Sequence, residues 1–392
     1  MKWLQTFLIF TVFTALSACF SQSDNTNNLQ EPKYPFGDNP EACEINTNHS
    51  DNNEINWPAL LTENCNKISD YNLFSAINNN SRSANSPGLL YELNSALFTD
   101  HARKYRYVFI PENTQASYQE LNAFDFPVGT VLVKFFYLPI NTEQPEEELL
   151  EIRLLIHREN GWFTLPYKWY EHLSDGYISV AGDSIASVIT HNSVSESFNY
   201  QIPTFGQCST CHKGEDANGT ALITPIGLKA RHLNKIINHN GSDINQLTLW
   251  NNLGVITGLP ENLAVIDTAP NWRDESVNIE QRAKAYLDIN CAHCHTDGGA
   301  GALSGLRMEY WRKEIDYLHG VCNGSQGWRV GGFDIWPGRA EISHIPMRMG
   351  LTAAKDRMPP IGRSLVENEA IALISEWINT MPYLECSSTQ SP

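Results

Sequence analysis

Two short stretches of the chain share one pattern, in which two cysteines separated by two residues are followed at once by a histidine. Residues 208–212 read Cys-Ser-Thr-Cys-His, and residues 291–295 read Cys-Ala-His-Cys-His. Such a pair of thiols can add to the two vinyl groups on one edge of a porphyrin, while the adjacent imidazole binds the iron. The pattern therefore predicts two covalently bound haem c groups. The residues predicted to hold them are Cys208, Cys211, His212, Cys291, Cys294 and His295.

Zinc is the strongest alternative occupant for these four thiols. Two such cysteine pairs can form a four-thiolate zinc site, but the pairs of a zinc ribbon are usually separated by roughly 15–20 residues. Here about 79 residues lie between Cys211 and Cys291. A thiol redox motif would explain either pair alone, but it would not explain the histidine that follows both. The sequence favours haem.

The surroundings of the second motif predict a cytochrome c domain over residues 279–392. Apolar residues recur at helical spacing over residues 279–289, directly ahead of Cys291. Residues 364–367 read as a capping box, and apolar residues at helical spacing follow. We expect these two helices to pack across each other.

Met358 is the predicted second iron ligand of this haem. It precedes Pro359 and Pro360, which stiffen an extended segment that can hold a thioether over the iron. Met347 and Met349 are the alternatives, and we expect them to line the pocket or the core.

The first motif lacks an equivalent ligand, because no methionine lies between Cys211 and Met308. His232 is a candidate on a predicted helix, and His239 follows it. A lone histidine on such a helix is more often a structural residue than a ligand. An iron with no sixth ligand could instead bind peroxide or another small molecule.

The N-terminus predicts export. Lys2 is followed by an apolar run over residues 3–16, and residues 16–19 read Leu-Ser-Ala-Cys, as in a bacterial lipoprotein signal. We expect residues 1–18 to be removed and Cys19 to carry a lipid; an ordinary signal peptide is the alternative. The predicted location is the outer membrane, facing the periplasm or the cell surface.

The other four cysteines are expected to form two disulfides, since the compartment is oxidising. Four cysteines allow three pairings. We favour Cys43 with Cys65, within one short segment, and Cys322 with Cys386, which would tie a loop to the C-terminus.

Composition limits the partners. The 392 residues include only 27 Lys and Arg, and the formal net charge is −17. This is the wrong sign for binding phosphates, so no nucleic-acid partner is expected. The predicted partners are a redox protein with a basic surface and, through the lipid, a membrane.

The region ahead of the motifs is predicted to be all-β. Residues 19–86 are rich in Asn and Ser and suggest a flexible tether with one disulfide. Residues 87–202 contain β-branched and aromatic runs, and Asn160-Gly161 marks a hairpin. The expected fold class is thus a β-sandwich-like domain over residues 87–202, followed by all-α cytochrome c-type haem regions over residues 203–278 and 279–392. The predicted strands cover residues 105–110, 131–138, 149–157, 162–170 and 198–202.

Several stretches taken together resemble a family of bacterial diheme c-type cytochromes known as conserved hypothetical proteins. The resemblance spans roughly residues 89–381, and it rests on residues 93–100, 126–130, 152–155 and 161–162 together with both motifs. It implies that residues 291–295 with 358–360 form one haem site, and that residues 208–212 with 225–227 form the other. It implies no substrate and no sixth ligand for the first haem.

Two function classes follow from these predictions. The first is an exported diheme cytochrome that transfers electrons, which needs no catalytic residue. The alternative is a diheme enzyme of the peroxidase type with an open first haem.

Overall fold

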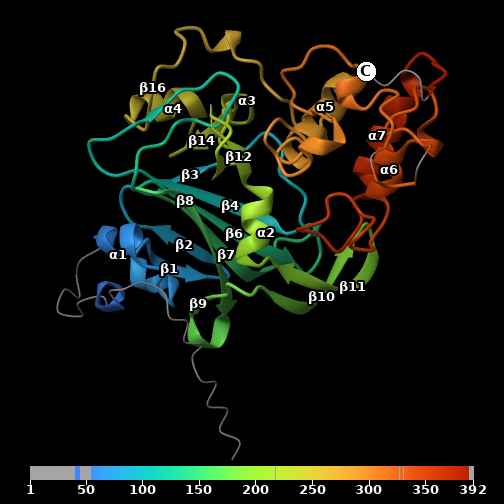
Figure 1. Ribbon diagram of the computed structural model, residues 1–392. Coiled ribbons are helices and arrows are strands. Elements are labelled where there is room, and N and C mark those ends of the chain that lie inside the picture. The colour runs from blue at the N-terminus through green and yellow to red at the C-terminus, as the bar shows by residue number, and fades with distance from the viewer. Residues whose placement is uncertain (1–39, 45–53, 217, 326, 330, 388–392) are drawn as a thin grey trace, which may run out of the picture. The chain divides into compact units, whose positions relative to one another are not determined.

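The computed structural model describes residues 40–44, 54–216, 218–325, 327–329 and 331–387 (Figure 1). The predicted signal segment and Cys19 lie outside these residues. All the described residues belong to one compact unit. None of the helices described is long and apolar enough to cross a membrane.

The largest element is a six-stranded antiparallel sheet, in which the strands lie in the order β3-β4-β6-β7-β8-β9. The stretches at 105–110, 131–138, 149–157 and 162–170, predicted as strands, form most of β4, β6, β7 and β8. The Asn160-Gly161 hairpin is confirmed, since β7 pairs with β8 as far as Arg158 and Gly161. The strands are β3 (Leu89–Tyr91), β4 (Arg103–Phe109), β6 (Val131–Pro139), β7 (Glu147–Arg158), β8 (Gly161–Tyr170) and β9 (Asp175–Ile178).

The two faces of this sheet have different surroundings, because successive side chains of a strand point to opposite faces. In β6, Val131, Val133 and Phe135 are fully buried in the main apolar core. On the other face, Leu132 packs in a second apolar cluster, and Lys134 lines an open cavity. The sheet therefore separates an apolar core on one face from a partly charged cavity on the other.

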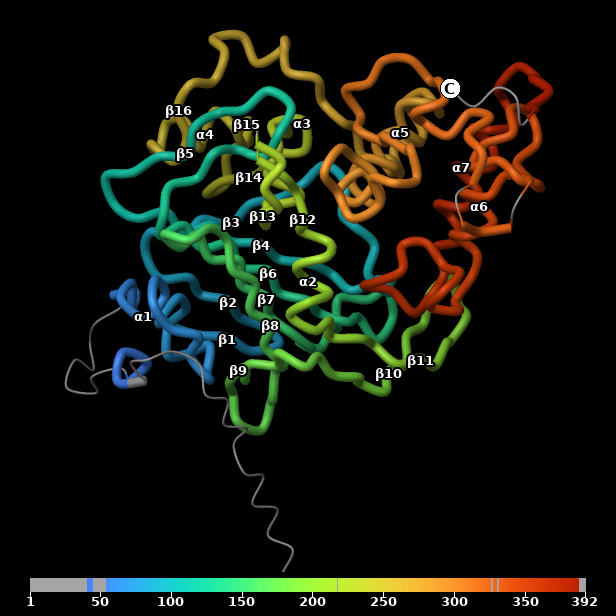
Figure 2. The backbone as a smooth tube through the Cα atoms, viewed as in Figure 1, coloured from blue at the N-terminus to red at the C-terminus, as the bar shows by residue number. Residues whose placement is uncertain are grey.

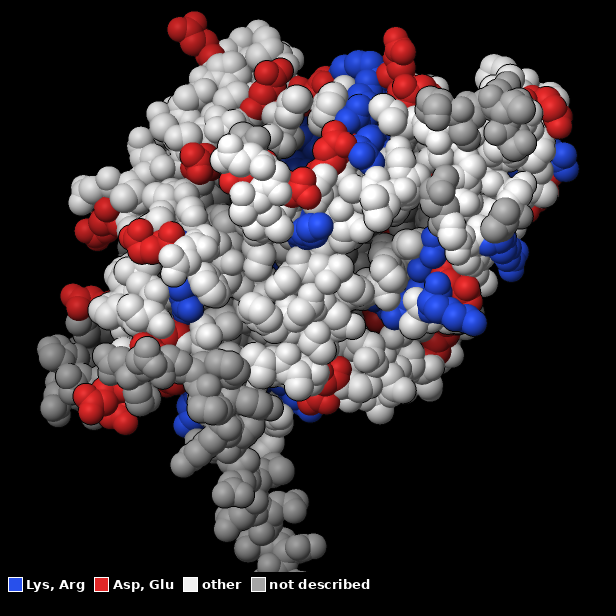
Figure 3. Space-filling view, in the orientation of Figure 1, with Lys and Arg blue, Asp and Glu red and all other residues white. Residues whose placement is uncertain are grey.

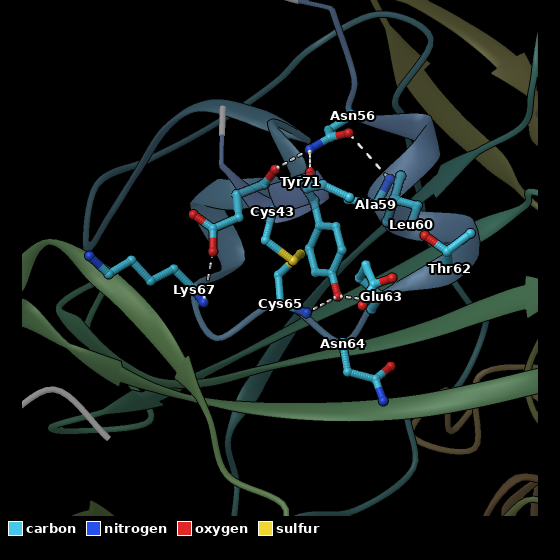
Figure 4. The surroundings of a disulfide bond; sticks show 12 residues. Cys43, Asn56, Ala59, Leu60, Thr62, Glu63, Asn64, Cys65, Lys67 and Tyr71 are labelled. Atoms are coloured by element: carbon cyan, nitrogen blue, oxygen red, sulfur yellow. Dashed lines mark hydrogen bonds between the residues drawn. A yellow bond between two sulfur atoms is a disulfide. The ribbon is translucent and has the colours of Figure 1, made fainter. Parts of the chain in front are cut away.

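The N-terminal part of the described chain covers the apolar face. A disulfide joins Cys43 to Cys65, as favoured from the sequence (Figure 4). Beside it, the hydroxyl of Tyr71 accepts a hydrogen bond from the amide of Cys65 and donates one to the carbonyl of Glu63. Residues 54–86, within the stretch predicted as a flexible tether, thus pack into the core instead. They form α1 (Trp57–Thr62), β1 (Phe74–Asn78) and β2 (Ser81–Ala84).

The segment with the first motif crosses the other face. Helix α2 (Phe205–Cys211) lies against β8 (Figure 2). The helices that follow are α3 (Ala230–Leu233) and α4 (Gln246–Asn252). Besides β1 with β2, the two-stranded pairs among the described residues are β10 (Asp183–His191) with β11 (Val194–Ile202), β12 (Lys213–Glu215) with β13 (Ala221–Ile223), β14 (Ile236–His239) with β15 (Ser242–Asn245), and β5 (Ala116–Ser117) with β16 (Ile256–Thr257).

The C-terminal part contains α5 (Ile279–Asn290), α6 (His344–Met349) and α7 (Asn368–Thr380), and α5 packs against α7. A second disulfide joins Cys322 to Cys386. Short 3-10 helices complete the chain: η1 (Pro40–Cys43), η2 (Ile68–Tyr71), η3 (Glu171–Leu173), η4 (Leu263–Val265), η5 (Ala302–Ser304), η6 (Tyr317–His319) and η7 (Ala340–Ile342).

The predicted capping box before α7 does not form, and the helix begins at Asn368. The amides of Ser364 and Leu365 both donate to Oδ1 of Asp100 at 2.7 Å, while the Ser364 hydroxyl donates to the carbonyl of Asn199. A tertiary contact thus takes the groups that would have capped the helix.

The expected fold class is wrong. Residues 87–202 form one large sheet with a hairpin, β10–β11, rather than a β-sandwich. Residues 203–278 contain more strands than helices, and the described residues form no haem-binding helical domain. Two helices were correctly placed near the second motif, but much of residues 291–367 is irregular chain. The apolar periodicity that predicted α5 and α7 gave no information about the loops between them.

A buried ionic cluster links the segment of the first motif to α5. Oδ2 of Asp288 accepts hydrogen bonds from Nε of Arg231 at 2.8 Å and from Nε2 of His232 at 2.7 Å. All three residues are at most 2% exposed. Burial by itself raises the pKa of Asp288, but Arg231 and then His232 outweigh it and lower the pKa well below its usual range.

We expect Asp288→Asn to lower the free energy of unfolding by about 3–5 kcal/mol, because it leaves the Arg231 charge buried without a partner. Since the pKa of Asp288 is depressed in the folded state, its contribution is present above about pH 4 and is lost as the pH falls below that value. Urea unfolding at pH 7 and acid unfolding, both followed by circular dichroism, measure these effects.

The matched control is Asp267→Asn, which removes an exposed ion pair with Lys313. This change should cost at most about 1 kcal/mol. Equal destabilisation by the two variants would contradict a structural role for the Asp288 cluster.

Candidate functional site

The first motif lies on an open cavity with about 1140 Å³ of empty space, called here the first cavity. Cys208, Cys211 and His212 line it from α2 and its C-terminal end. The sheet, the loop at 225–227 and the segment 359–362 supply the remaining walls. Besides the residues of the motif, the polar residues that line this cavity include Thr99, Arg106, Lys134, Arg153, Thr164, Gln207 and His293.

Helix α2 has a well-formed start that orients the two cysteines. Thr204 accepts a hydrogen bond from the amide of Gln207, and the Gln207 side chain accepts one from the amide of Thr204. This is a capping box, and it satisfies two backbone donors that would otherwise lack partners. Cys208 and Cys211, three residues apart on this helix, consequently lie on the same face.

The hydrogen bond of His212 determines which ring nitrogen can bind a metal. Nδ1 lies 2.7 Å from the backbone carbonyl of Thr224, and a carbonyl can only accept. Nδ1 must therefore carry the proton, and Nε2 keeps its lone pair. Burial lowers the pKa of His212 to about 4, which favours the neutral ring. The neutral ring with a lone pair at Nε2 is the form of histidine that can bind a metal ion.

The second motif lies on a smaller cavity with about 600 Å³ of empty space, called here the second cavity. Cys291, His295 and Met358 all line it. Met358, the predicted iron ligand, and His295 thus line the same cavity. Met349 also lines this cavity, as does Met308, which the sequence analysis did not consider as a ligand.

His295 is held in the same way as His212. Its Nδ1 lies 2.9 Å from Oγ of Ser304, and that hydroxyl already donates to the carbonyl of Gly301 at 2.7 Å. Nδ1 must therefore donate to Ser304, which leaves Nε2 as the atom with a lone pair. A Cβ at Gly301 would lie 3.0 Å from the imidazole, so a larger residue at this position would press against the His295 ring.

Arg363 fixes the segment that carries Met358. Its buried Nη2 donates to the carbonyls of Met358 at 2.8 Å and of Met349 at 3.0 Å. The same nitrogen also lies within hydrogen-bonding distance of the carbonyls of Arg348 and Leu351. A single guanidinium thus organises an otherwise irregular turn around the second cavity.

The two motifs are adjacent in space. The side chains of Cys211 and Cys294 are in hydrogen-bonding contact, which lowers the pKa of the Cys211 thiol and raises that of the Cys294 thiol. His293, within the second motif, also contacts Cys211 and lines the first cavity. Pro359 lines both cavities. The two candidate sites therefore share a wall.

The other predicted ligands lie elsewhere. His232 is held in the Asp288 cluster and does not line the first cavity, and its Nδ1 is buried without a partner. His239 lies at the end of β14, outside the cavity lining. The sulfur of Met347 accepts a hydrogen bond from Arg329, while Met349 is buried at the second cavity. Of these two methionines, which were expected to line the pocket or the core, only Met349 lines the second cavity.

Sequence reasoning did not identify His293 or the basic residues of the sheet as site residues. His293 had been taken only as a spacer of the second motif. The signal for the basic residues was present, because Arg106, Lys134 and Arg153 are cations inside apolar strands. Their meeting in one cavity depends on strand pairing, which the sequence alone does not specify.

The arrangement does not favour zinc. Within the residues described, no group of three or more His, Cys, Asp or Glu side chains could hold a metal ion. The four thiols of the motifs therefore do not converge as a four-thiolate site would require. The donors that the structure does bring together are Cys208, Cys211 and His212 at the first cavity and Cys291 and His295 at the second, and thiols beside a histidine are the side chains that haem c would need.

Comparison with known proteins finds no matching family model, curated protein or solved structure. The resemblance to diheme c-type cytochromes accordingly stays a prediction from the motifs.

If Met358 is the iron ligand of the second haem, Met358→Ala should abolish the methionine-to-iron charge-transfer band of the oxidised protein. Met349→Leu and Met308→Leu, which change two other thioethers of the same cavity, should retain it. The absorption spectrum of each purified variant tests this. Persistence of the band in Met358→Ala would refute the assignment.

Proposed function

We propose that this protein is an exported diheme c-type electron-transfer protein. One haem would be bonded to Cys208 and Cys211 with His212 as an iron ligand. The other would be bonded to Cys291 and Cys294. When bound, haem c supplies one-electron oxidation and reduction of its iron. In this proposal the first haem site lies against the sheet, and the second lies among α5, α6 and irregular loops, rather than in all-α domains.

The observation that carries the proposal is the contact between the two motifs. Cys211 and Cys294 are far apart in sequence, yet each thiol shifts the pKa of the other, and His293 of the second motif lines the first cavity. Because each thiol is expected to bond one porphyrin edge, the two edges would be neighbours. Such an arrangement favours electron transfer between the groups, whereas two unrelated sites would need no shared wall.

The histidine geometry supports the proposal independently. Both His212 and His295 donate from Nδ1, so both present a lone pair at Nε2. For the second haem we propose His295 and Met358 as the pair of iron ligands, as their shared cavity supports. For the first haem, His293 is a lining residue, besides His212, with a ring nitrogen able to bind iron.

The proposed location rests on the disulfides and the proposed lipid anchor, and the proposed partner rests on the net charge of the chain. The disulfides Cys43–Cys65 and Cys322–Cys386 are typical of a protein in an oxidising compartment. Anchoring through a lipid on Cys19 belongs to the same proposal. The net charge of −17 favours a redox partner with a basic surface. Figure 3 shows acidic and basic side chains interspersed on the face it displays, so net charge alone does not define a docking patch.

A diheme enzyme of the peroxidase type is the second candidate. It is favoured by one observation: no methionine is among the described residues that line the first cavity, and that cavity is open. An iron there without a sixth ligand would be accessible to a small molecule.

The proposal is tested by producing the full chain in a periplasm that attaches haem c. Mass spectrometry should find two haems per chain. Cys208→Ser with Cys211→Ser should leave one haem that retains the methionine charge-transfer band. Cys291→Ser with Cys294→Ser should leave one haem without it. Ser209→Ala, on the exposed side of the same helix, is the control and should retain both haems.

A chain that matures without haem, or with zinc, would contradict the proposal. Cyanide separates the two candidate functions. An electron-transfer protein with two low-spin haems should show no rapid spectral change on addition of cyanide. A high-spin fraction that binds cyanide would favour the enzyme.

A further inference from the structure

Three basic side chains form a row on the floor of the first cavity. Arg106, Lys134 and Arg153 occupy directly paired positions on β4, β6 and β7, and all three line the cavity. At the usual spacing of strands, the row is about 10 Å long. Like charges in opposed positions destabilise a sheet. The row therefore requires negative charge from another source.

The described chain supplies that charge to only one end of the row. Nε of Arg153 donates to Glu151 at 2.9 Å, and Glu151 also accepts a hydrogen bond from Tyr200 at 2.6 Å. Among the residues described, neither Arg106 nor Lys134 forms an ion pair. Glu92 attracts Arg106 but is itself paired with Lys235 at 2.6 Å. Two cations thus remain without a counter-charge.

Arg106 has an unused donor. The residue is 7% exposed, and its Nη2 is buried without a hydrogen-bond partner. Its Nη1 makes one long hydrogen bond, 3.3 Å, to the carbonyl of Lys104. Burial lowers the pKa of Arg106, and burial followed by repulsion from Arg106 lowers that of Lys134 well below its usual value. A buried guanidinium with a free N–H is costly unless an acceptor comes to it.

One end of this row lies closer to the first motif than the other end does. Cys208 is next to Thr164 of β8 and interacts with Arg153 of β7. Arg106, on β4, is two strands farther away. In haem c the two carboxylates leave the porphyrin edge opposite the thioethers. A porphyrin bonded at Cys208 would therefore direct its carboxylates toward the end of the row that lacks negative charge.

We propose that Arg106 and Lys134 form the binding site for the two carboxylates of the haem bonded at Cys208 and Cys211. This inference rests on the proposed function. A guanidinium and an ammonium are the side chains that bind carboxylates most strongly, and Arg106 can do so through two parallel N–H groups. Arg153 is already neutralised by Glu151 and has no such role. The same row could otherwise take a free carboxylate or inorganic anion.

The experiment uses the full chain with haem attached, in four variants. Mass spectrometry first counts the haems, and this step alone judges the proposed function. Spectroelectrochemical titration then gives the midpoint potential of each haem. The variants are Arg106→Met, Arg106→Lys, Lys134→Met and, as a control, Arg103→Met. Arg103 lies on the same strand but pairs with Glu147 at 3.3 Å.

In Arg106→Met we expect the reduction equilibrium constant of one haem to fall about tenfold, a shift of about 59 mV to lower potential. Loss of a nearby positive charge favours the oxidised iron. The other haem should be unchanged, Arg106→Lys should recover most of the shift, and Arg103→Met should match the wild type. Lys134→Met should lower the potential of the same haem.

Wild-type potentials in both Arg106→Met and Lys134→Met, with two haems attached, would overturn the inference. If Arg106→Met does not fold, Lys134→Met alone decides. Acetate distinguishes the source of the anion. A saturable spectral change with acetate that disappears in the Arg106 or Lys134 variants would assign the row to a free anion and would also overturn the inference.

Discussion

The carboxylate of Asp288 is the interaction on which the rest of the arrangement depends. It lies on α5, immediately before the second motif, and it binds Arg231 and His232 from the segment that follows the first motif. Its Oδ1 also accepts a hydrogen bond from the amide of Tyr310. Because every partner is buried, loss of the Asp288 carboxylate would leave the Arg231 charge without a counter-charge in a low-dielectric interior. The cluster therefore holds the segments of the two motifs in a fixed relation.

From this relation follow the features that bear on function. The thiols of Cys211 and Cys294 meet, His293 reaches the cavity of the other motif, and Pro359 lies between the two cavities. The sites differ in character. The second lies among α5, α6 and the turn organised by Arg363, whereas the first rests on the charged face of the sheet. The second cavity is lined by three methionine thioethers, and the first by a row of three basic side chains.

Structural order extends beyond what composition suggested. Residues 54–86 resemble a linker in sequence, yet Tyr71 and the Cys43–Cys65 disulfide anchor them on the apolar face of the sheet. On the opposite face the sheet carries cations where a sandwich would carry apolar side chains. In the described part of the chain, α2 and the short β12–β13 pair contact β8 on that face in place of a second large sheet, which leaves room for a site.

By itself the sequence determined the chemistry that is local. Two thiols and a histidine at fixed spacing, the alternating strands, the Asn160-Gly161 hairpin and the periodic helices at 279–290 and 368–380 all depend on neighbouring residues. The tertiary structure decided what depends on distant residues: the single sheet in place of a sandwich, the strands among residues 203–278, the use of His232 as a partner of Asp288, and the cation row. These features arise from strand register and from buried charge pairs, which bring together residues that are scores of positions apart in the sequence. No local sequence pattern specifies such contacts.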